Sequence, residues 1–161
     1  MTASQELSQL YRRDLTRLLQ ELQAFPGDDL LWQCRPGIAN SAGNLFLHLE
    51  GNLLEFIGRQ LGGIEYQRRR ELEFASAGLS QEALVEKLQR LLEIIPSGIA
   101  ELTDDALDAA YPQIVLGTPL STRQFLIHLN GHLNYHLGQI DYLRRILTAG
   151  GAIPLAGLIA S

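Results

Sequence analysis

Apolar residues recur at helical spacing in four stretches of the chain, and no stretch has the convincing alternation of a strand. The first stretch runs from about Ser4 to Phe25, where Pro26 and Gly27 stop it. The second begins near Ser41, a residue that suits a helix N-cap, and runs to about Leu61 before two glycines. These signals predict two helices joined by a loop.

The other two stretches also carry helix start signals. One begins at Ser80 and continues to about Leu102, and the proline at position 96 predicts a kink or an early end there. The last begins at Ser121, which has the capping-box spacing to Gln124, and continues to about Leu147. The sequence therefore predicts an all-α fold with four helices.

The connectors between these helices are long. Residues 62–79 include 67–74, which could form a short extra helix, and residues 103–120 make up the second long connector. Connections of this length allow crossovers, so neighbouring helices need not be antiparallel. The apolar, glycine-rich tail over 152–161 is expected to pack against the bundle or across a partner.

Three histidines stand on one side of the last predicted helix. With His132 as the reference, His128 and His136 lie about 40° to either side, together with apolar residues such as Leu129 and Leu133. Polar residues of this helix, namely Asn130, Asn134 and Arg144, fall on the opposite side. Imidazoles are costly to bury unless their nitrogens have partners, and a metal ion is one partner that suits several imidazoles at once.

A third metal ligand would have to come from another helix, and the remaining histidine is His48 in the second helix. His132 and His136 are four residues apart, so both rings could bind one ion. Neutral imidazoles suit zinc, nickel, iron or copper, and three protein ligands leave a position open for water or substrate. The alternative is that these histidines are hydrogen-bonded structural residues.

Polar residues beside the histidines are further candidates. The row through His48 also holds Asn52 and Glu55, and these two side chains, with Gln139, could orient ligands or touch substrate. Helix capping or partner contacts would explain them equally well. His128 lies one turn further out, so we expect it to support the site rather than to bind the metal.

Composition narrows the classes of function. The chain has 161 residues, which suits a single domain over residues 1–161, and its net charge is −5. Only Arg68–Arg70 forms a basic cluster, which we interpret as a solvated charge run, so nucleic-acid binding is not expected. Neither a signal peptide nor an apolar run of membrane-spanning length is found. A single cysteine, Cys34, excludes an internal disulfide and fits a reducing cytoplasm; we expect it to pack beside Trp32.

Two segments resemble a known family. His132–Ile140 is similar to the last-helix signature of the DinB/YfiT-like proteins, in which two histidines four apart are followed by Gly-Gln-Ile. Trp32, Pro36–Gly37 and Ser41–Leu49 resemble the entry to that family's second helix. The resemblance implies a four-helix bundle with long crossover connections, often dimeric.

The resemblance also implies a metal site and a chemistry. Its ligands would be His48, His132 and His136, with His128 outside this set, and the ion would be a divalent transition metal such as Zn, Ni or Fe. Characterised relatives include transferases and isomerases that use bacillithiol, mycothiol or glutathione. A metal-dependent transferase would act on a low-molecular-weight thiol and a small electrophile. The alternatives are a metal-dependent hydrolase, a non-enzymatic stress-associated protein that binds metal or a small ligand, and a structural dimer that binds no metal.

A dimer is also expected from the second helix itself. Several apolar residues lie away from the His48 row, namely Phe46, Leu47, Leu53, Leu54 and Ile57. A helix that is apolar nearly all round is usually covered on all sides. A partner subunit or the apolar tail could provide the cover that the bundle does not.

Overall fold

The computed structural model of the chain describes residues 1–154, and this part is helical. Its elements are α1 (Ala3–Gln23), α2 (Asp28–Leu31), α3 (Ala42–Leu53), the π-helix η1 (Leu54–Arg59), α4 (Arg70–Ala75), α5 (Gln81–Ala100), α6 (Asp104–Asp108) and α7 (Thr122–Thr148). Within these residues two isolated bridges occur but no strand. The all-α prediction is confirmed.

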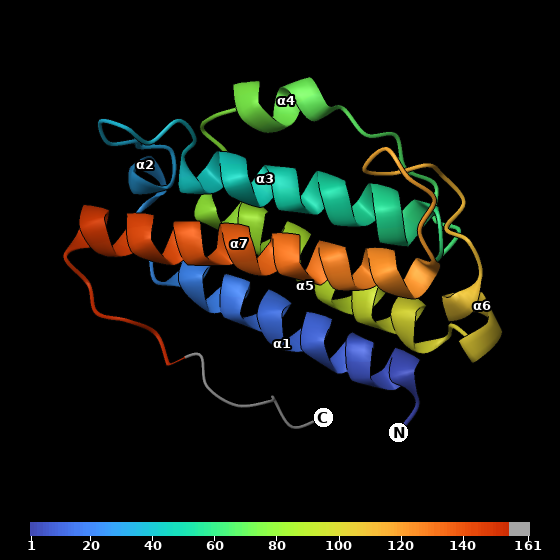
Figure 1. The fold of residues 1–161 in the computed structure, drawn as a ribbon. Coiled ribbons are helices and arrows are strands. Elements are labelled where there is room, and N and C mark those ends of the chain that lie inside the picture. The colour runs from blue at the N-terminus through green and yellow to red at the C-terminus, as the bar shows by residue number, and fades with distance from the viewer. Residues whose placement is uncertain (155–161) are drawn as a thin grey trace.

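The long helices α1, α3, α5 and α7 lie side by side (Figure 1). Both α5 and α7 pack against α1, and both also pack against α3, so α1 lies diagonally opposite α3. In Figure 1, α1 and α7 run from right to left, whereas α3 and α5 run from left to right. The chain must therefore return along the bundle between α3 and α5, and this crossover carries α4 over the outer side of α3 (Figure 1).

Serine and threonine caps start the long helices where the sequence predicts. The side chains of Ser41, Ser80 and Ser121 each accept a hydrogen bond from the backbone N–H three residues later. The short helix predicted in the first long connector is α4, which begins at Arg70. The helix containing Pro96 does not end there but continues to Ala100. Neither α2 nor α6 was expected from the hydrophobic pattern.

The second predicted helix changes its winding before it ends. Residues 42–53 are α-helical, and 54–59 are wound as a π-helix, in which the Gln60 N–H donates to the Glu55 carbonyl, five residues earlier, at 3.3 Å. The hydroxyl of Tyr111 donates to the Phe56 carbonyl at 2.8 Å and so satisfies a backbone group of this segment. π-Helical turns are rare and are frequent near functional sites.

The apolar sides of α3 are covered within one chain. Its outlying apolar residues are all at most 8% exposed: Phe46, Leu47, Leu53, Leu54 and Ile57. Helices α4, α5 and α7 pack against α3, and α5 also packs against η1. The apolar sides of α3 therefore give no reason to expect a dimer. The tail that was the other candidate cover lies mostly in 155–161, outside the described residues.

The polar side of α7 faces α1 rather than solvent. Asn130 and Asn134 donate to the buried carboxylate of Asp14 at 3.1 and 2.7 Å, and Arg144 forms a buried ion pair with Glu21. The helical pattern placed these α7 residues opposite the apolar stripe, which is correct, but that side is also packed. These polar side chains can be buried because carboxylates of α1 accept their hydrogen bonds.

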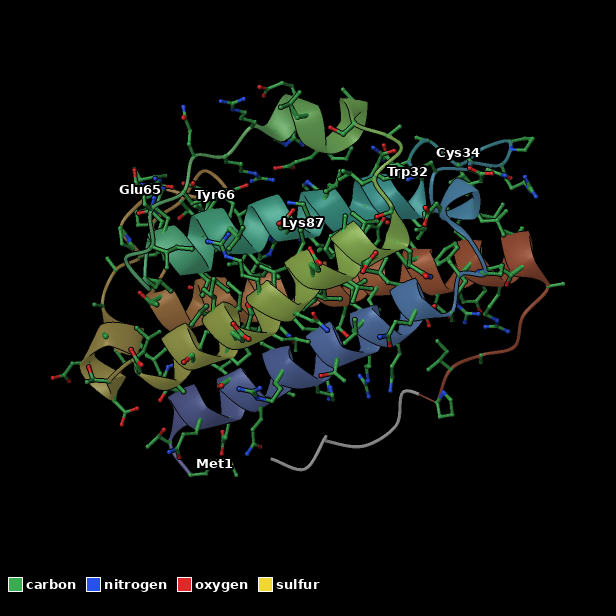
Figure 2. All side chains as sticks on the ribbon, turned by 180° about the vertical axis from the view of Figure 1, so that it is seen from behind. Met1, Trp32, Cys34, Glu65, Tyr66 and Lys87 are labelled. Carbon is green, nitrogen blue, oxygen red and sulfur yellow. The ribbon has the colours of Figure 1, made fainter. Side chains whose placement is uncertain are left out.

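Two loop residues before α3 behave differently from each other (Figure 2). Trp32 packs on α3, where a Cβ at Gly43 would come within 2.7 Å of its ring, and its Nε1–H donates to the Leu79 carbonyl. Cys34 is exposed, so the expectation that it packs beside Trp32 is wrong.

In the described part of the chain, no helix is both long and apolar enough to cross a membrane.

Candidate metal centre

Three imidazoles from two helices converge on one point. The Nε2 atom of His132 lies 3.2 Å from Nε2 of His48 and 3.1 Å from Nε2 of His136. One ligand atom from each of the three residues lies within 4.8 Å of the others. The three rings are set edge to face, with interplanar angles of 74° to 87°. The structure thus brings together the three histidines that the sequence singled out, in a group that could hold a metal ion.

The spacing suits a small divalent ion. Two nitrogens that bind one zinc ion at about 2.0–2.1 Å in tetrahedral geometry lie about 3.3 Å apart. The two Nε2–Nε2 distances of 3.1 and 3.2 Å are close to that value. When neutral imidazole rings all point Nε2 at the same place, at least one pair of Nε2 lone pairs face and repel each other. A cation bound between the nitrogens removes that repulsion. These residues therefore fit a metal ion bound through nitrogen.

Glu73 holds His48 in place from behind. Its carboxylate lies 2.9 Å from Nδ1 of His48, and because a carboxylate can only accept, this contact puts the proton on Nδ1 and leaves the Nε2 lone pair free. Arg68 in turn donates two hydrogen bonds to the carboxylate, of 2.7 and 2.9 Å. A carboxylate behind a histidine in this way fixes the ring and makes it a better metal ligand.

The interpretation of Arg68 as part of a solvated charge run is therefore wrong. Its side chain is only 14% exposed, because it is committed to Glu73. The sequence reasoning also missed Glu73, which is 6% exposed and comes from α4. Burial raises the pKa of the Glu73 carboxyl, but the hydrogen bonds from His48 and Arg68 outweigh burial and hold that pKa below its usual value.

Two residues of α3 make room for α4 and attach it. The side-chain amide of Asn44 donates to the backbone carbonyls of Glu73 and Ser76, at 3.1 and 2.8 Å. At Gly51, a Cβ atom would lie 2.1 Å from the Glu73 carboxylate, so any other residue there would force that carboxylate to shift. The ring of Phe74 also packs on the His48 ring, with centroids 5.0 Å apart. Asn44 thus attaches the backbone of α4 to α3, and both Glu73 and Phe74 contact the His48 ring.

The two histidines of α7 differ in their outer contacts. Nδ1 of His136 lies 2.7 Å from the side-chain oxygen of Gln139, an acceptor that likewise directs Nε2 to the cluster. Nδ1 of His132 is buried and has no hydrogen-bond partner among residues 1–154. Burial, together with the imidazoles of His136 and His48, lowers the pKa of His132 to about 4, and burial also lowers the pKa of His136. Both rings are therefore neutral at pH 7, as metal binding requires.

The other predicted site residues lie at different distances from the cluster. Gln139 contacts His136 directly, as described above. His128 is exposed and stacks on Phe125, with centroids 6.0 Å apart, outside the group of converging nitrogens. Glu55 forms an ion pair with Arg59 and a long hydrogen bond with Gln60, and it is not part of the group of converging imidazoles.

A hollow opens beside the three imidazoles. Its volume is about 520 Å³. His48, His132 and His128 line it together with Asn52, Phe56, Arg68, Arg70 and the loop residues 113–116. The side-chain oxygen of Asn52 is buried and unpartnered within the described residues. The cluster therefore faces a cavity large enough for a small molecule, with a polar atom available for it.

Comparison with known proteins places this arrangement in a family. Residues 10–140 match the family model described as the DinB superfamily, so the chain belongs to that superfamily. The fold is similar to the crystal structure of a DinB-like protein from Bacillus cereus ATCC 10987, with a TM-score of 0.68 and 19% sequence identity over 91% of this chain and 95% of that chain. No curated protein matches the chain. The family resemblance predicted from the two sequence segments is confirmed.

Proposed function

We propose that this protein is a metal-dependent enzyme that transfers a low-molecular-weight thiol to a small electrophile. The observation that carries the proposal is the convergence of three Nε2 atoms, at 3.1 and 3.2 Å, on a point beside a cavity. His48, His132 and His136 would hold a divalent transition metal such as Zn, Ni or Fe. Fewer than four protein ligands leave a coordination position for a substrate.

The ion would supply Lewis acidity that lowers the pKa of a bound thiol, so that thiolate is present at neutral pH. Glu73 keeps the proton of His48 on Nδ1, and Gln139 does the same for His136, so that both rings present a lone pair. In such a transfer the thiol proton would leave to solvent. The sulfur would form a bond to a carbon of the electrophile, and the group displaced from that carbon would depart with the bonding electron pair.

The cavity supports the same assignment of roles. Phe56 and the apolar loop residues at its wall would contact the carbon skeleton of a substrate. Asn52 offers an unpartnered acceptor to a donor on the substrate. Arg70 also lines the cavity and would attract an acidic group. Hydrolysis by a metal-activated water is the chemical variant of this proposal, and stoichiometric binding of a metal or small ligand is the non-enzymatic alternative.

The test begins with untagged protein, because a histidine tag binds the same metals. Elemental analysis should find about one zinc, nickel or iron per chain, and a chelator should remove it. Reloaded protein should then consume thiol in the presence of a model electrophile such as 1-chloro-2,4-dinitrobenzene, with a panel of small thiols compared. Turnover that needs both metal and thiol supports the transferase. Metal binding without turnover of any thiol favours the binding protein, and metal-dependent turnover without thiol favours the hydrolase.

A further inference from the structure

Two large apolar side chains are exposed at the cavity beside the imidazoles. Ile114 and Leu116 both line that cavity, and they are 75% and 63% exposed. Val115 between them packs against the core, as the alternation of side chains along an extended segment allows. A pair of apolar side chains in a cavity wall differs from scattered apolar surface residues and is typical of a ligand-binding site.

Leu116 has a backbone conformation that leucine rarely adopts. Its φ is 55° and that of Gly117 is 75°, and the Thr118 N–H donates to the Val115 carbonyl at 3.1 Å. This turn therefore has positive φ at both central positions, where glycine, asparagine and aspartate are favoured and a leucine is disfavoured. Disfavoured backbone conformations cluster at ligand-binding and active sites. The leucine at this position therefore indicates a role for its side chain in the cavity.

Another part of the cavity wall is basic. Arg68 and Arg70 line it, and no aspartate or glutamate does so within the described residues. Arg68 is bound to Glu73, as described above. The guanidinium of Arg70 lies 5.5 Å from the ring centroid of Phe74, and it has no carboxylate partner within residues 1–154. The whole chain has a net charge of −5, so this positive charge is a local feature, and it fits an anionic group.

We infer that the cavity binds a small organic acid with an apolar body, whose carboxylate meets Arg70 and whose body lies against Ile114 and Leu116. The cavity volume of about 520 Å³ suits a molecule of this kind. Figure 1 shows the connector before α7 reaching up beside the segment that leads to α4, so the apolar and basic walls come from two different connectors. The inference names the substrate class of the proposed enzyme, and it rests on the proposed function only in taking this cavity as the substrate site.

The first test measures binding by calorimetry on untagged protein in the presence of zinc, with octanoate as the probe. Octanoate should bind. Octanol lacks the carboxylate and acetate lacks the apolar body, so each should bind at least about tenfold more weakly. Equal affinity for octanoate and octanol would overturn the role of the basic wall, and equal affinity for octanoate and acetate would overturn the role of the apolar wall.

The second test compares two neighbouring arginines. Arg70→Gln and Arg69→Gln each remove one positive charge from an exposed side chain, but Arg70 lines this cavity whereas Arg69 lines a different hollow. Arg70→Gln should weaken octanoate binding about fivefold and leave octanol binding unchanged, while Arg69→Gln should change octanoate binding by less than about twofold. An equal loss in the two variants would overturn the inference. No loss in Arg70→Gln would do so too, since it is the result expected if the carboxylate bound the metal alone.

The third test separates a ligand contact from a structural role of Leu116. Leu116→Asn removes the apolar side chain and suits the positive φ, so the thermal midpoint without ligand should stay the same or rise. Octanoate binding should weaken by about fivefold or more, and acetate binding should not change. A lower midpoint with unchanged octanoate affinity would show that Leu116 supports the fold, and would overturn the inference.

The three tests need no turnover, so their failure differs from failure of the proposed function. Octanoate binding that follows the pattern above, without any thiol transfer, would contradict the proposed function alone. Metal-dependent thiol transfer without any preference for apolar acids would contradict this inference alone.

Discussion

The chemistry of the candidate site depends on which nitrogen of each imidazole carries the proton. His48 and His136 have acceptors at Nδ1, namely Glu73 at 2.9 Å and Gln139 at 2.7 Å, so both Nε2 lone pairs point at the cluster. His132 has no such acceptor within the described residues and is held by packing alone. Among the described residues, its specific partners are the other two histidines, with which it would share the ion. His132 is therefore the residue whose replacement isolates metal binding from the rest of the fold.

His132→Ala should abolish tight metal binding while leaving the helical fold largely intact. Two remaining imidazoles bind an ion weakly, and the apolar residues of α7 still pack in the core, among them Leu129 and Leu133. His128→Ala is the matched control, because it removes an exposed histidine from the same helix and should change affinity less. Calorimetric titration with zinc compares the three proteins. Equal affinity in wild type and His132→Ala would exclude the three-histidine site, and a larger loss in His128→Ala would show that His128 rather than His132 binds the ion.

Gly51→Ala should weaken metal binding without unfolding the protein. The added methyl would lie 2.1 Å from the Glu73 carboxylate, so the carboxylate must leave its contact with His48. Loss of such an outer contact typically costs about 10- to 100-fold in metal affinity. Gly98→Ala is the control, since its Cβ would meet its nearest neighbour at 3.9 Å. Unchanged zinc affinity in Gly51→Ala would mean that Glu73 does not support the site.

At this scale the sequence could predict the triad but not its support. The four-residue spacing of His132 and His136 fixes their relation within one helix, and His48 is the one histidine left over. Glu73 reaches His48 only because the crossover between α3 and α5 lays α4 over α3. No helical period relates residues 25 positions apart through an irregular connector, so this contact had no signal in the pattern.

At the scale of elements, the helices are defined by their caps and paired by both apolar and polar contacts. The periodicity and the serine caps were sufficient to place the long helices. They were insufficient to show that the polar side of α7 is buried, because the pattern of one helix does not reveal its neighbour. The neighbour is α1, whose Asp14 and Glu21 meet Asn130, Asn134 and Arg144. A buried polar side is stable only when its partners come from another element, and that information is tertiary.

The contact of α1 with α7 should make stability depend on acid in a specific way. Burial raises the pKa of Asp14, but hydrogen bonds from Arg13, Asn134 and Asn130 outweigh burial and hold that pKa below its ordinary value. A carboxyl whose pKa is lowered by folding stabilises the protein above its unfolded pKa of about 4, and this contribution is lost as the pH falls further. Asp14→Asn should therefore be less stable than wild type at pH 7, by about 1–3 kcal/mol, and the difference should shrink at pH 3.

Urea unfolding at pH 3 and pH 7 measures both differences. Glu86→Gln changes an exposed carboxylate on α5 and is the control, with little expected effect at either pH. A constant difference between wild type and Asp14→Asn across this range would mean that the Asp14 charge is not what joins α1 to α7.

At the scale of the whole molecule, the metal would link elements that are far apart in the chain. The crossover brings α4 against one side of α3, and α7 packs against the other side of α3, so that three elements meet at the imidazoles (Figure 1). The order in which the helices pack was not predictable from the sequence, because connectors of this length permit several arrangements. A ligand that binds only this arrangement stabilises all of it at once.

Metal should therefore raise the thermal midpoint of the whole chain, and the rise should depend on pH. At a metal concentration of 100 times Kd the expected stabilisation is about 2.7 kcal/mol, or roughly 5–10 °C for a chain of this size. Folding lowers the pKa of His132 from 6.5 to about 4, so its neutral form is stable in the native state down to that pH. Without metal, the stability that this ring contributes is complete above pH 6.5 and is lost as the pH falls toward 4, because the unfolded chain gains the proton first.

The same shift governs how protons compete with the ion. Because burial lowers the pKa of His132 to about 4 and also lowers the pKa of His136, protons compete with the ion for these two rings only below the ordinary histidine pKa, and the metal-induced rise should shrink as the pH falls toward 4. Differential scanning fluorimetry with and without zinc, from pH 4 to pH 8, measures this directly. His128→Ala should behave as wild type does, whereas His132→Ala should show neither the metal-induced rise nor its share of the acid dependence. A rise of equal size in His132→Ala would mean that the ion binds elsewhere on the chain.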